Sequence, residues 1–573
     1  MPPITQGDFA FAPALTDVCE GITIADQSMR FGNIEIDPAT NPAVLDTVTW
    51  DPPQARHIVG SVEPSYWCMV GEGQMAAEHR SCTVYRGSLA RYGGGTHLLV
   101  RLSDGQHVFV AIGAPQGVAG LGLPLHTMPI GDGQFLAIHA ADVATVRRYI
   151  GALRPDKGPR AMGAVPRLGI GTRMSTSVWP GIWPAMDEGE FKANAIQNSV
   201  RELNLLEDVL AGRPARTNYL YGFGTLEEGH TGSTFEGLWL AGVIEALKTD
   251  THPEYGADAD HITVRRGPGG LERAKRVIDA ARDYTFFTLD VSDIIDYSAQ
   301  ALQCSTPAPG GDPSRGRLGY IDRKYGAALD VVAELVAHIK NLKGEAPFDL
   351  ELSIDECPPG MKPSTCLTTE AELLFLIEEL RRRGIPMTHV APNVGIVKGQ
   401  DYDTAGLLEF EQRLGRLHVI AMDRGIMLDI HSGDDLSAAA RQAIGRATRG
   451  HNHFKVSPSL QVIFGQVLWE FDRQRFRLWW DDTLAYARRE TAAGSEFALR
   501  CLREYESSGD AEPSPHHAVF HHYNFASVGR RDGHGRFVNR ENFYNLPADF
   551  YGQYHDRIRA FLGDVADGVF RRG

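Results

Sequence analysis

Aspartate, glutamate and histidine recur in five short β-prone runs of this chain. Alone, such a residue is most often a helix cap or a hydrogen-bonded core residue. Five such runs are harder to explain in that way, because closure of a parallel barrel brings its strand ends around one mouth. The runs are ADADHITV, TFFTLDVSD, FDLELSIDE, IMLDIHSGDD and HNHFKVS, with candidates Asp258, Asp260, His261, Asp290, Asp293, Asp355, Glu356, His431, Asp434, Asp435, His453 and Lys455.

Imidazole and carboxylate groups without a thiolate are typical of a divalent metal site, for Zn, Mn, Ni, Co or Fe. No HExxH or CxxC motif narrows the choice. His453 and Lys455 are two residues apart, so on a strand they share a face, and one could bind the metal while the other contacts substrate. Asp429 and His431 have the same spacing, which would let Asp429 orient the imidazole.

These residues need a scaffold that brings distant segments together. From Arg167 onward, short apolar runs alternate with longer segments of helical period, and eight repeats predict an α/β fold, a (β/α)8 TIM-type barrel. A doubly wound sheet is the alternative, but GIGTRM lacks the third glycine of a dinucleotide turn. The predicted strands are RLGIGTRM, TNYLYGFG, HITV, TFFTLD, FDLELSI, MTHVAP, IMLDIHSG and HFKVS, and the predicted helices include FKANAIQNSVRELNLLEDVLAG and GLERAKRVIDAARD.

Residues 1–160 are predicted to form a β-rich accessory domain, and residues 161–573 the barrel. In THLLVRLSDGQHVFVAIG, Asp104-Gly105 separates two strand-like runs, which predicts a hairpin with a type I′ turn. The segment 151–167 concentrates Gly, Pro and charge, which is typical of a boundary.

Composition limits the partners. The formal charge of -15 disfavours nucleic acid and anionic membranes, although a pocket can still be locally positive. The seven cysteines are scattered without a CxxC pair, so no disulfide framework is expected. There is no apolar run long enough for a membrane span and no signal-peptide pattern. We expect a cytoplasmic protein that binds a small molecule and could form a homo-oligomer.

Three further motifs are weak. RYGGGT and RRGPGG are glycine-rich but lack the Lys-Ser/Thr of a phosphate loop, and no GxSxG elbow is present. The tandem His521 and His522 are expected at the surface, outside the site.

Several motifs, in order, resemble the tagaturonate epimerase family, whose members interconvert tagaturonate and fructuronate. They are GIGTRM, ADADHI, TFFTLDVSD, LSIDE, VAPNVG, DIHSGDD and HFKVSPS, of which LSIDE, DIHSG and the His-x-Lys strand are the most informative. The resemblance runs from about Arg167 to the C-terminus. It implies a metal-dependent sugar-acid epimerase on an α/β barrel, with related proteins acting on neutral ketohexoses.

The resemblance implies roles for individual residues. The implied metal ligands are His261, Glu356, His431 and His453. Arg173 would clamp a substrate carboxylate, since guanidinium matches its geometry. Thr172 stands where the family has an acid, and the N-terminal region is larger than expected, so the substrate stays open. The further predicted groups are Asp260, Asp290, Asp355 and Lys455 for catalysis, and His230 and Asn393 for substrate binding.

Inversion two bonds from a ketone cannot use simple deprotonation, because no enolate would stabilise the carbanion. We therefore expect retro-aldol cleavage, rotation of the aldehyde and re-addition, with a metal to hold the enediolate. Two alternatives stay open: a metal-free aldolase with Lys455 as Schiff-base nucleophile, and a carbohydrate-binding barrel without catalysis.

Overall fold

The structure is a computed structural model of the 573-residue chain. The described residues are 29–31, 34–36, 52–74, 79–118, 120–174, 177–211, 213–220, 224–301, 313–356, 361, 365–397, 399–402, 406–507, 512–530, 538–544 and 546–570. The N-terminal part of the predicted accessory domain and most of the loop after LSIDE lie outside them.

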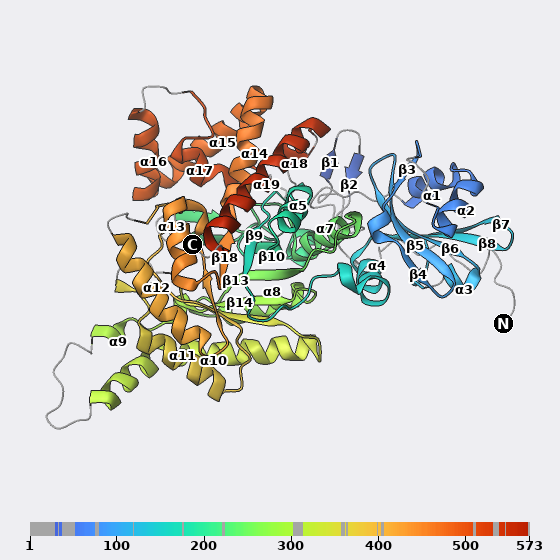
Figure 1. Cartoon of the computed structure of the whole chain (residues 1–573). Helices are drawn as coiled ribbons and strands as arrows, with labels where there is room; N and C mark the ends of the chain where they lie inside the picture. The colour runs from blue at the N-terminus through green and yellow to red at the C-terminus, as the bar shows by residue number, and fades with distance from the viewer. Residues whose placement is uncertain are drawn as a thin grey trace.

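A closed barrel of parallel strands forms the centre of the larger part of the chain, as predicted (Figure 1). Parallel strands need crossover connections, and helices on the outside of the barrel supply them. In barrel order the strands are β9 (Arg167–Gly171), β10 (Lys192–Ser199), β13 (Tyr255–Thr263), β14 (Phe286–Asp290), β15 (Asp349–Ser353), β16 (His389–Ala391), β17 (Met427–Ile430) and β18 (Asn452–Val456).

The crossover helices turn their apolar residues toward the barrel. Thr369 caps one of them with a full capping box, in which Glu372 returns a hydrogen bond to the cap. The crossover helices are α5 (Trp179–Glu188), α7 (Phe235–Lys248), α8 (Gly270–Ala280), α10 (Pro313–Lys343), α11 (Glu370–Arg382), α12 (Leu407–Met422) and α13 (Ala438–Thr448), with the short α6 (Leu206–Leu210) and α9 (Ser298–Ala301) between them. Helix α14 (Pro458–Phe471) follows the last barrel strand.

The second barrel strand was assigned wrongly from the sequence. KANAIQNS, inside a predicted helix, is β10, and it pairs with β9 and β13. TNYLYGFG instead supplies β11 (Thr217–Leu220) and the start of β12 (Gly224–Glu227), an antiparallel pair outside the barrel. The predicted number of barrel strands was therefore right, but one of the predicted segments was not a barrel strand.

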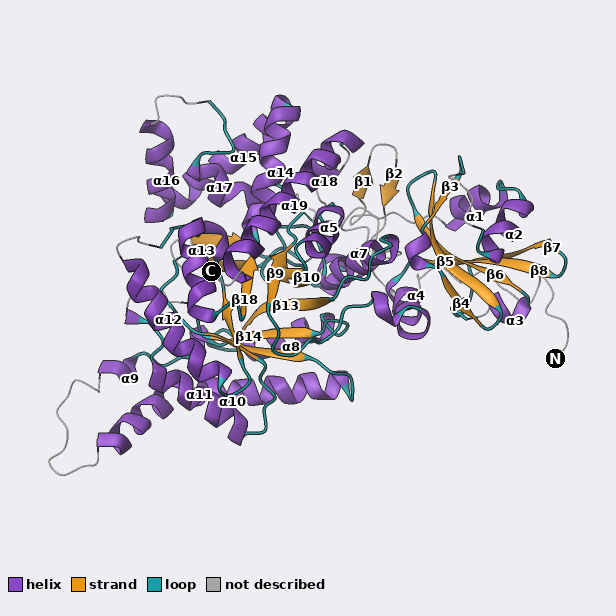
Figure 2. Cartoon of the chain, in the orientation of Figure 1, coloured by secondary structure: helices purple, strands orange, loops and turns teal. Residues whose placement is uncertain are grey.

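An antiparallel sheet lies beside the barrel, which confirms the β-rich N-terminal region (Figure 2). The predicted hairpin joins β5 to β6, but only Gly105 takes a positive φ, so the turn is not type I′. The strands are β3 (Cys82–Val84), β4 (Ala90–Tyr92), β5 (Gly95–Leu102), β6 (His107–Gly113), β7 (His126–Gly131) and β8 (Gln134–Ala140); β1 (Met29–Phe31) and β2 (Ile34–Ile36) pair separately.

One face of this sheet shares a core with the barrel. Leu99, Phe109 and Tyr149 belong to the same cluster of buried side chains as the barrel strands. The other face packs on α1 (Pro52–Gly60) and α2 (Pro64–Glu72) through a core of its own.

Helices at the C-terminal end complete the fold. α19 (Ala548–Phe570) packs against α5, α13 and α14. The others are α15 (Arg473–Ala492), α16 (Glu496–Ser507), α17 (Ala518–Tyr523) and α18 (Arg540–Tyr544). Within the described residues, no helix is both long and apolar enough to cross a membrane, and no disulfide is found.

Candidate active site

Strand β13 delivers two neighbouring polar side chains to the barrel mouth. Its pairing with β14 shifts register between Ala259 and Ile262, and His261 takes a φ of 56°. Non-glycine residues rarely adopt this conformation, which is retained where the surroundings impose it. The irregularity lets Asp260 and His261, which would face opposite ways on a regular strand, both line one pocket.

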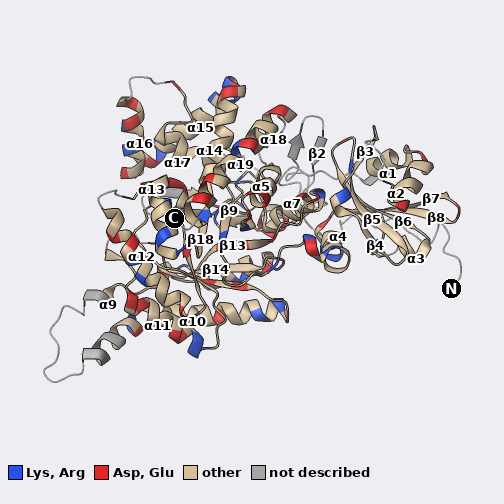
Figure 3. Cartoon of the chain, viewed as in Figure 1, with Lys and Arg blue, Asp and Glu red and all other residues tan. Residues whose placement is uncertain are grey.

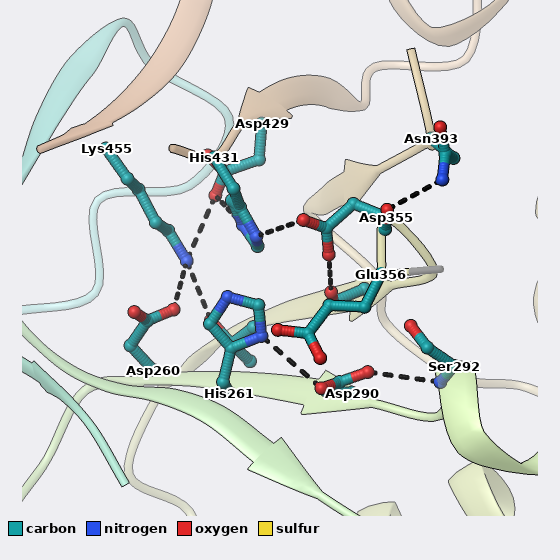
Figure 4. Close-up of polar contacts among 12 residues, drawn as sticks. Asp260, His261, Asp290, Ser292, Asp355, Glu356, Asn393, Asp429, His431 and Lys455 are labelled. Atoms are coloured by element: carbon teal, nitrogen blue, oxygen red, sulfur yellow. Dashed lines mark hydrogen bonds and ion pairs between the residues drawn. The ribbon is translucent and has the colours of Figure 1, made fainter. Parts of the chain in front are cut away.

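Lys455 on β18 lies among four buried carboxylates, two of which, Asp260 and Asp429, are labelled in Figure 4. Its Nζ is 2.9 Å from Asp260 Oδ1 and 2.9 Å from Glu351 Oε2. Asp258 and Asp429 each approach it to 3.3 Å. Burial would lower the pKa of Lys455, but these carboxylates raise it well above its usual value. The side chain is therefore an ammonium ion.

Two imidazole rings line the same pocket as Lys455. The rings of His261 and His431 have centroids 4.6 Å apart. His431 Nε2 is 2.8 Å from Glu351 Oε1, and its Nδ1 is 3.2 Å from Asp355 Oδ2. His261 Nδ1 is 3.4 Å from Asp290 Oδ2. Burial opposes protonation of His431, yet Asp355 and the other acids raise its pKa well above the ordinary value.

The donor set fits a divalent ion. Four groups of described residues each offer three ligand atoms within 4.8 Å of one another. Two of these groups line the pocket in full, and of these two only Asp260, His261 and His431 are all buried. Nitrogen and oxygen donors at this spacing suit Zn or another first-row metal. The other groups are Asp435, His521 and His522, which also line the pocket; His261, Asp290 and Glu356; and Glu351, Asp429 and His431.

His453 belongs to none of these groups. Its ring is fully buried, with Nδ1 2.7 Å from Asp429 Oδ2, and it packs against His389 and Phe286. Burial lowers its pKa well below the usual value. Glu356 and His431, two of the other predicted ligands, also fall in different groups. The four predicted ligands thus do not converge as one set.

Arg173 and His230 form part of the pocket wall. Arg173 Nη2 pairs with Glu202 at 2.7 Å, and its Nε donates to Ser457 Oγ at 3.1 Å. His230 also lines the pocket, and its buried Nδ1 has no hydrogen-bond partner among the described residues. Burial lowers the pKa of His230 well below its usual value, so its imidazole is neutral. Arg173 and His230 thus lie where substrate contacts were predicted.

Four other predicted residues do not line the pocket. Asp290 contacts the imidazole of His261 and Asp355 that of His431, and neither aspartate lines the pocket. Asn393 donates to the carbonyl of Asp355 at 2.8 Å and accepts from the amide of Gly395 at 3.1 Å, so both ends of its amide are used. Glu356 pairs with Arg201 Nη2 at 2.7 Å.

His521 and His522, expected at the surface, line the pocket from α17. His521 Nε2 is 3.1 Å from Asp435 Oδ1. Gln197 on β10 also lines the pocket, and its buried Oε1 has no hydrogen-bond partner among the described residues. His521, His522 and Gln197 lie outside the segments predicted as strands, so residue types at strand ends could not indicate them. Polar and apolar residues alternate in KANA, at the start of β10, and this was the signal for the strand that carries Gln197.

Fold and site together define a parallel (β/α)8 barrel with a buried ionisable pocket at the carboxyl ends of its strands. The model of the family UxaE, tagaturonate epimerase, matches residues 314–464, and this confirms the predicted resemblance. The match includes β15 to β18, with Glu351 and Lys455 on the strands and Asp355 and His431 just after them.

Individual epimerases are also similar to this chain. The tagaturonate/fructuronate epimerase of Thermotoga maritima is 27% identical over 365 residues, which are 59% of this chain and 65% of that protein. The chain thus spans just under two thirds of this relative. Two crystal structures of fructuronate-tagaturonate epimerase UxaE from Cohnella laeviribosi, with one and two glycerols, share the fold. Their TM-scores are 0.59 and 0.60, at 17% and 18% identity, over 90% of this chain and 99% of theirs.

Proposed function

We propose that this protein is a metal-dependent isomerase that epimerises ketohexuronates, interconverting tagaturonate and fructuronate or related ketoses. The observation that supports it most is the pocket in which Asp260, His261 and His431 lie within metal-binding reach of one another, beside Lys455. The match to epimerases gives the substrate class.

The residues suggest a division of labour. His261 and His431 would hold the ion, and Asp260, the third member of their group, would keep the catalytic role predicted for it. A divalent ion there would polarise the substrate ketone and stabilise negative charge on it. Asp290 and Asp355 would act as positioning residues, because each contacts an imidazole from behind.

Retro-aldol chemistry suits these groups. A carboxylate at the pocket takes the proton of the hydroxyl beside the bond that breaks, and Asp260 is the acid beside Lys455 that lines the pocket. The hydroxyl becomes an aldehyde and the bonding electrons pass to the ketone oxygen, near the Lys455 ammonium. Rotation of the aldehyde, bond formation on its other face and return of the proton complete the epimerisation. The charged Lys455 disfavours the Schiff-base alternative, which needs a neutral amine.

Arg173 and His230 would bind the substrate carboxylate and hydroxyls, because both line the pocket. Asn393 has a supporting role in this proposal, since it holds the backbone of Asp355.

The test is NMR of tagaturonate, fructuronate, tagatose and fructose, each incubated with the protein in the presence of a divalent metal. The proposal predicts that tagaturonate and fructuronate approach the same equilibrium mixture. Conversion of tagatose and fructose alone would show that the substrates are neutral ketoses and not ketohexuronates. Tight binding of all four sugars without turnover would favour the non-catalytic alternative.

A further inference from the structure

A second cleft lies outside the active-site pocket, at the start of α8. Its walls are the end of β10, the β11–β12 pair and the loop from β13 to α8. Five of its lining residues are arginines and one is a carboxylate: Arg201, Arg216, Arg265, Arg266, Arg273 and Glu228. Acidic and basic residues are otherwise intermixed along the barrel helices (Figure 3). Such a basic cleft is unusual in a chain with a net charge of -15.

Two of the arginines pair with carboxylates. Arg273 pairs with Asp208 and Glu228, at 2.9 and 2.8 Å, and Arg201 pairs with Glu356. The guanidinium of Arg266 is instead held by backbone carbonyls, including that of Ile295 at 2.8 Å. Backbone carbonyls carry no net charge. The positive charge of Arg266 is therefore fixed in place without being cancelled by these carbonyls.

Two more arginines stand exposed on the walls. Arg216 directly precedes β11, and Arg265 is the first residue of the glycine-rich turn RRGPGG. Guanidinium groups converging from separate elements match the oxygens of a phosphate, to which each can donate two hydrogen bonds.

The glycine-rich turn RRGPGG shapes the floor of the cleft. Gly267 and Gly269 take φ values of 98° and 84°. A Cβ on Gly270 would lie 2.1 Å from the carbonyl oxygen of Arg265, so the backbone passes close to itself there. Helix α8 begins at Gly270, and Gly269 has no side chain to cap its first turn. The first amides of the helix thus add donors and a positive dipole end to the arginines.

We propose that this cleft binds a small phosphate-bearing anion, either inorganic phosphate or a phosphate monoester. Arg216, Arg265 and Arg266 would supply the charge, and the start of α8 the backbone donors. This site is separate from the proposed epimerisation, and it stands or falls independently of the activity.

Isothermal titration calorimetry of the full chain with inorganic phosphate, and separately with glucose 6-phosphate, tests this. We expect saturable binding of at least one of them. Tighter binding of glucose 6-phosphate would identify a monoester site, and tighter binding of phosphate a site for the free ion. The double variant R216A/R265A removes two exposed side chains, so it should fold normally. It should weaken binding roughly a hundredfold, about tenfold for each guanidinium removed.

Arg446→Ala is the matched control for charge. Arg446 is an exposed arginine on α13 that pairs with Glu411, and its loss should leave binding unchanged. Absence of saturable binding to the wild-type chain would overturn the proposal. So would equal affinity in wild type and R216A/R265A, or binding that is lost in Arg173→Ala but kept in the double variant, which would place the anion in the active-site pocket.

Discussion

Lys455 is a charged side chain at the base of a pocket, with four carboxylates within 3.3 Å of its Nζ. A buried charge is tolerated when paired, but removing one partner leaves the others uncompensated. Lys455 therefore both holds the acids together and presents positive charge to a substrate.

Lys455→Met tests both roles. Methionine keeps most of the length but leaves Asp258, Asp260, Glu351 and Asp429 to repel one another. We expect stability to fall by roughly 3 kcal/mol, measured by urea denaturation, and epimerase turnover to fall at least about a hundredfold.

The double variant K455M/D258N separates the two effects. It removes one of the repelling charges, so stability should partly return while turnover stays low. If the double variant recovered turnover, Lys455 would matter through folding alone. A lysine adduct trapped by borohydride in the presence of tagaturonate would revive the Schiff-base alternative.

Glu236, in the first turn of α7, gives a dependence of stability on pH. Burial raises its pKa from 4.5 to about 7. The folded state therefore favours the neutral acid, and this contribution to stability is present below pH 4.5 and lost as the pH rises through 7. Glu236→Gln should gain roughly 1–3 kcal/mol over wild type at about pH 8, and much less at about pH 5.

Thermal melts of both proteins at the two pH values measure this difference. Glu272→Gln is the control, because Glu272 is a first-turn acid of α8 that is 73% exposed. It should show no comparable dependence on pH. A gain for Glu236→Gln that is the same at both pH values would refute the explanation.

Residue types at strand ends indicated part of the pocket. Asp260, His261, His431 and Lys455 lie together there. The depth of each side chain within the barrel was not predictable, because a strand sequence does not say in which layer of the barrel a side chain lies. His453 is two residues before Lys455 on the same strand and is consequently one layer deeper.

At the scale of elements, β10 shows where sequence patterns mislead. Its Ala and Gln residues are good helix formers and poor strand formers. Tertiary packing overrides that preference, since Ala193 and Ala195 are buried and Gln197 lines the pocket. TNYLYGFG has the stronger β propensity, yet it serves the β11–β12 pair.

Packing between β10 and α7 depends on a glycine. A Cβ on Gly242 would lie 2.5 Å from Cγ1 of Ile196 and 3.0 Å from Trp179. Gly242→Ala should therefore cost roughly 1–2 kcal/mol despite the better helix propensity of alanine.

Gly415 in α12 is the matched position. A Cβ there would meet its nearest atom, the carbonyl oxygen of Ala447, at an ordinary 3.6 Å. Gly415→Ala should be neutral or stabilise by up to about 1 kcal/mol. Chemical denaturation of both variants gives the comparison, and equal effects would show that the α7–β10 packing is looser than the structure indicates.

At the scale of the whole molecule, alternation of strand and helix patterns predicted the closed barrel, because few topologies accommodate eight such units. The sequence could not show that the N-terminal sheet shares a core with the barrel. Leu99 and Phe109 alternate as in any half-buried sheet, and the partner of their face is set by tertiary packing.

We retain residues 1–160 and 161–573 as the proposed domains, but expect the barrel to depend on the first. Deleting residues 1–160 would remove Tyr149 from the shared core, as well as Lys157, which donates to the carbonyl of Thr249. The fragment 161–573 should melt several degrees lower than the full chain or aggregate. An unchanged melting temperature would show that the two units are energetically independent.

The most direct test of the account is the interconversion of tagaturonate and fructuronate, followed by NMR with protein stripped of metal by a chelator and then reloaded with Mn, Co, Ni, Fe or Zn. If the pocket holds a catalytic metal, stripping abolishes turnover, at least one metal restores it, and no metal restores it in His261→Ala. Full turnover by protein shown by elemental analysis to be free of metal would contradict the account.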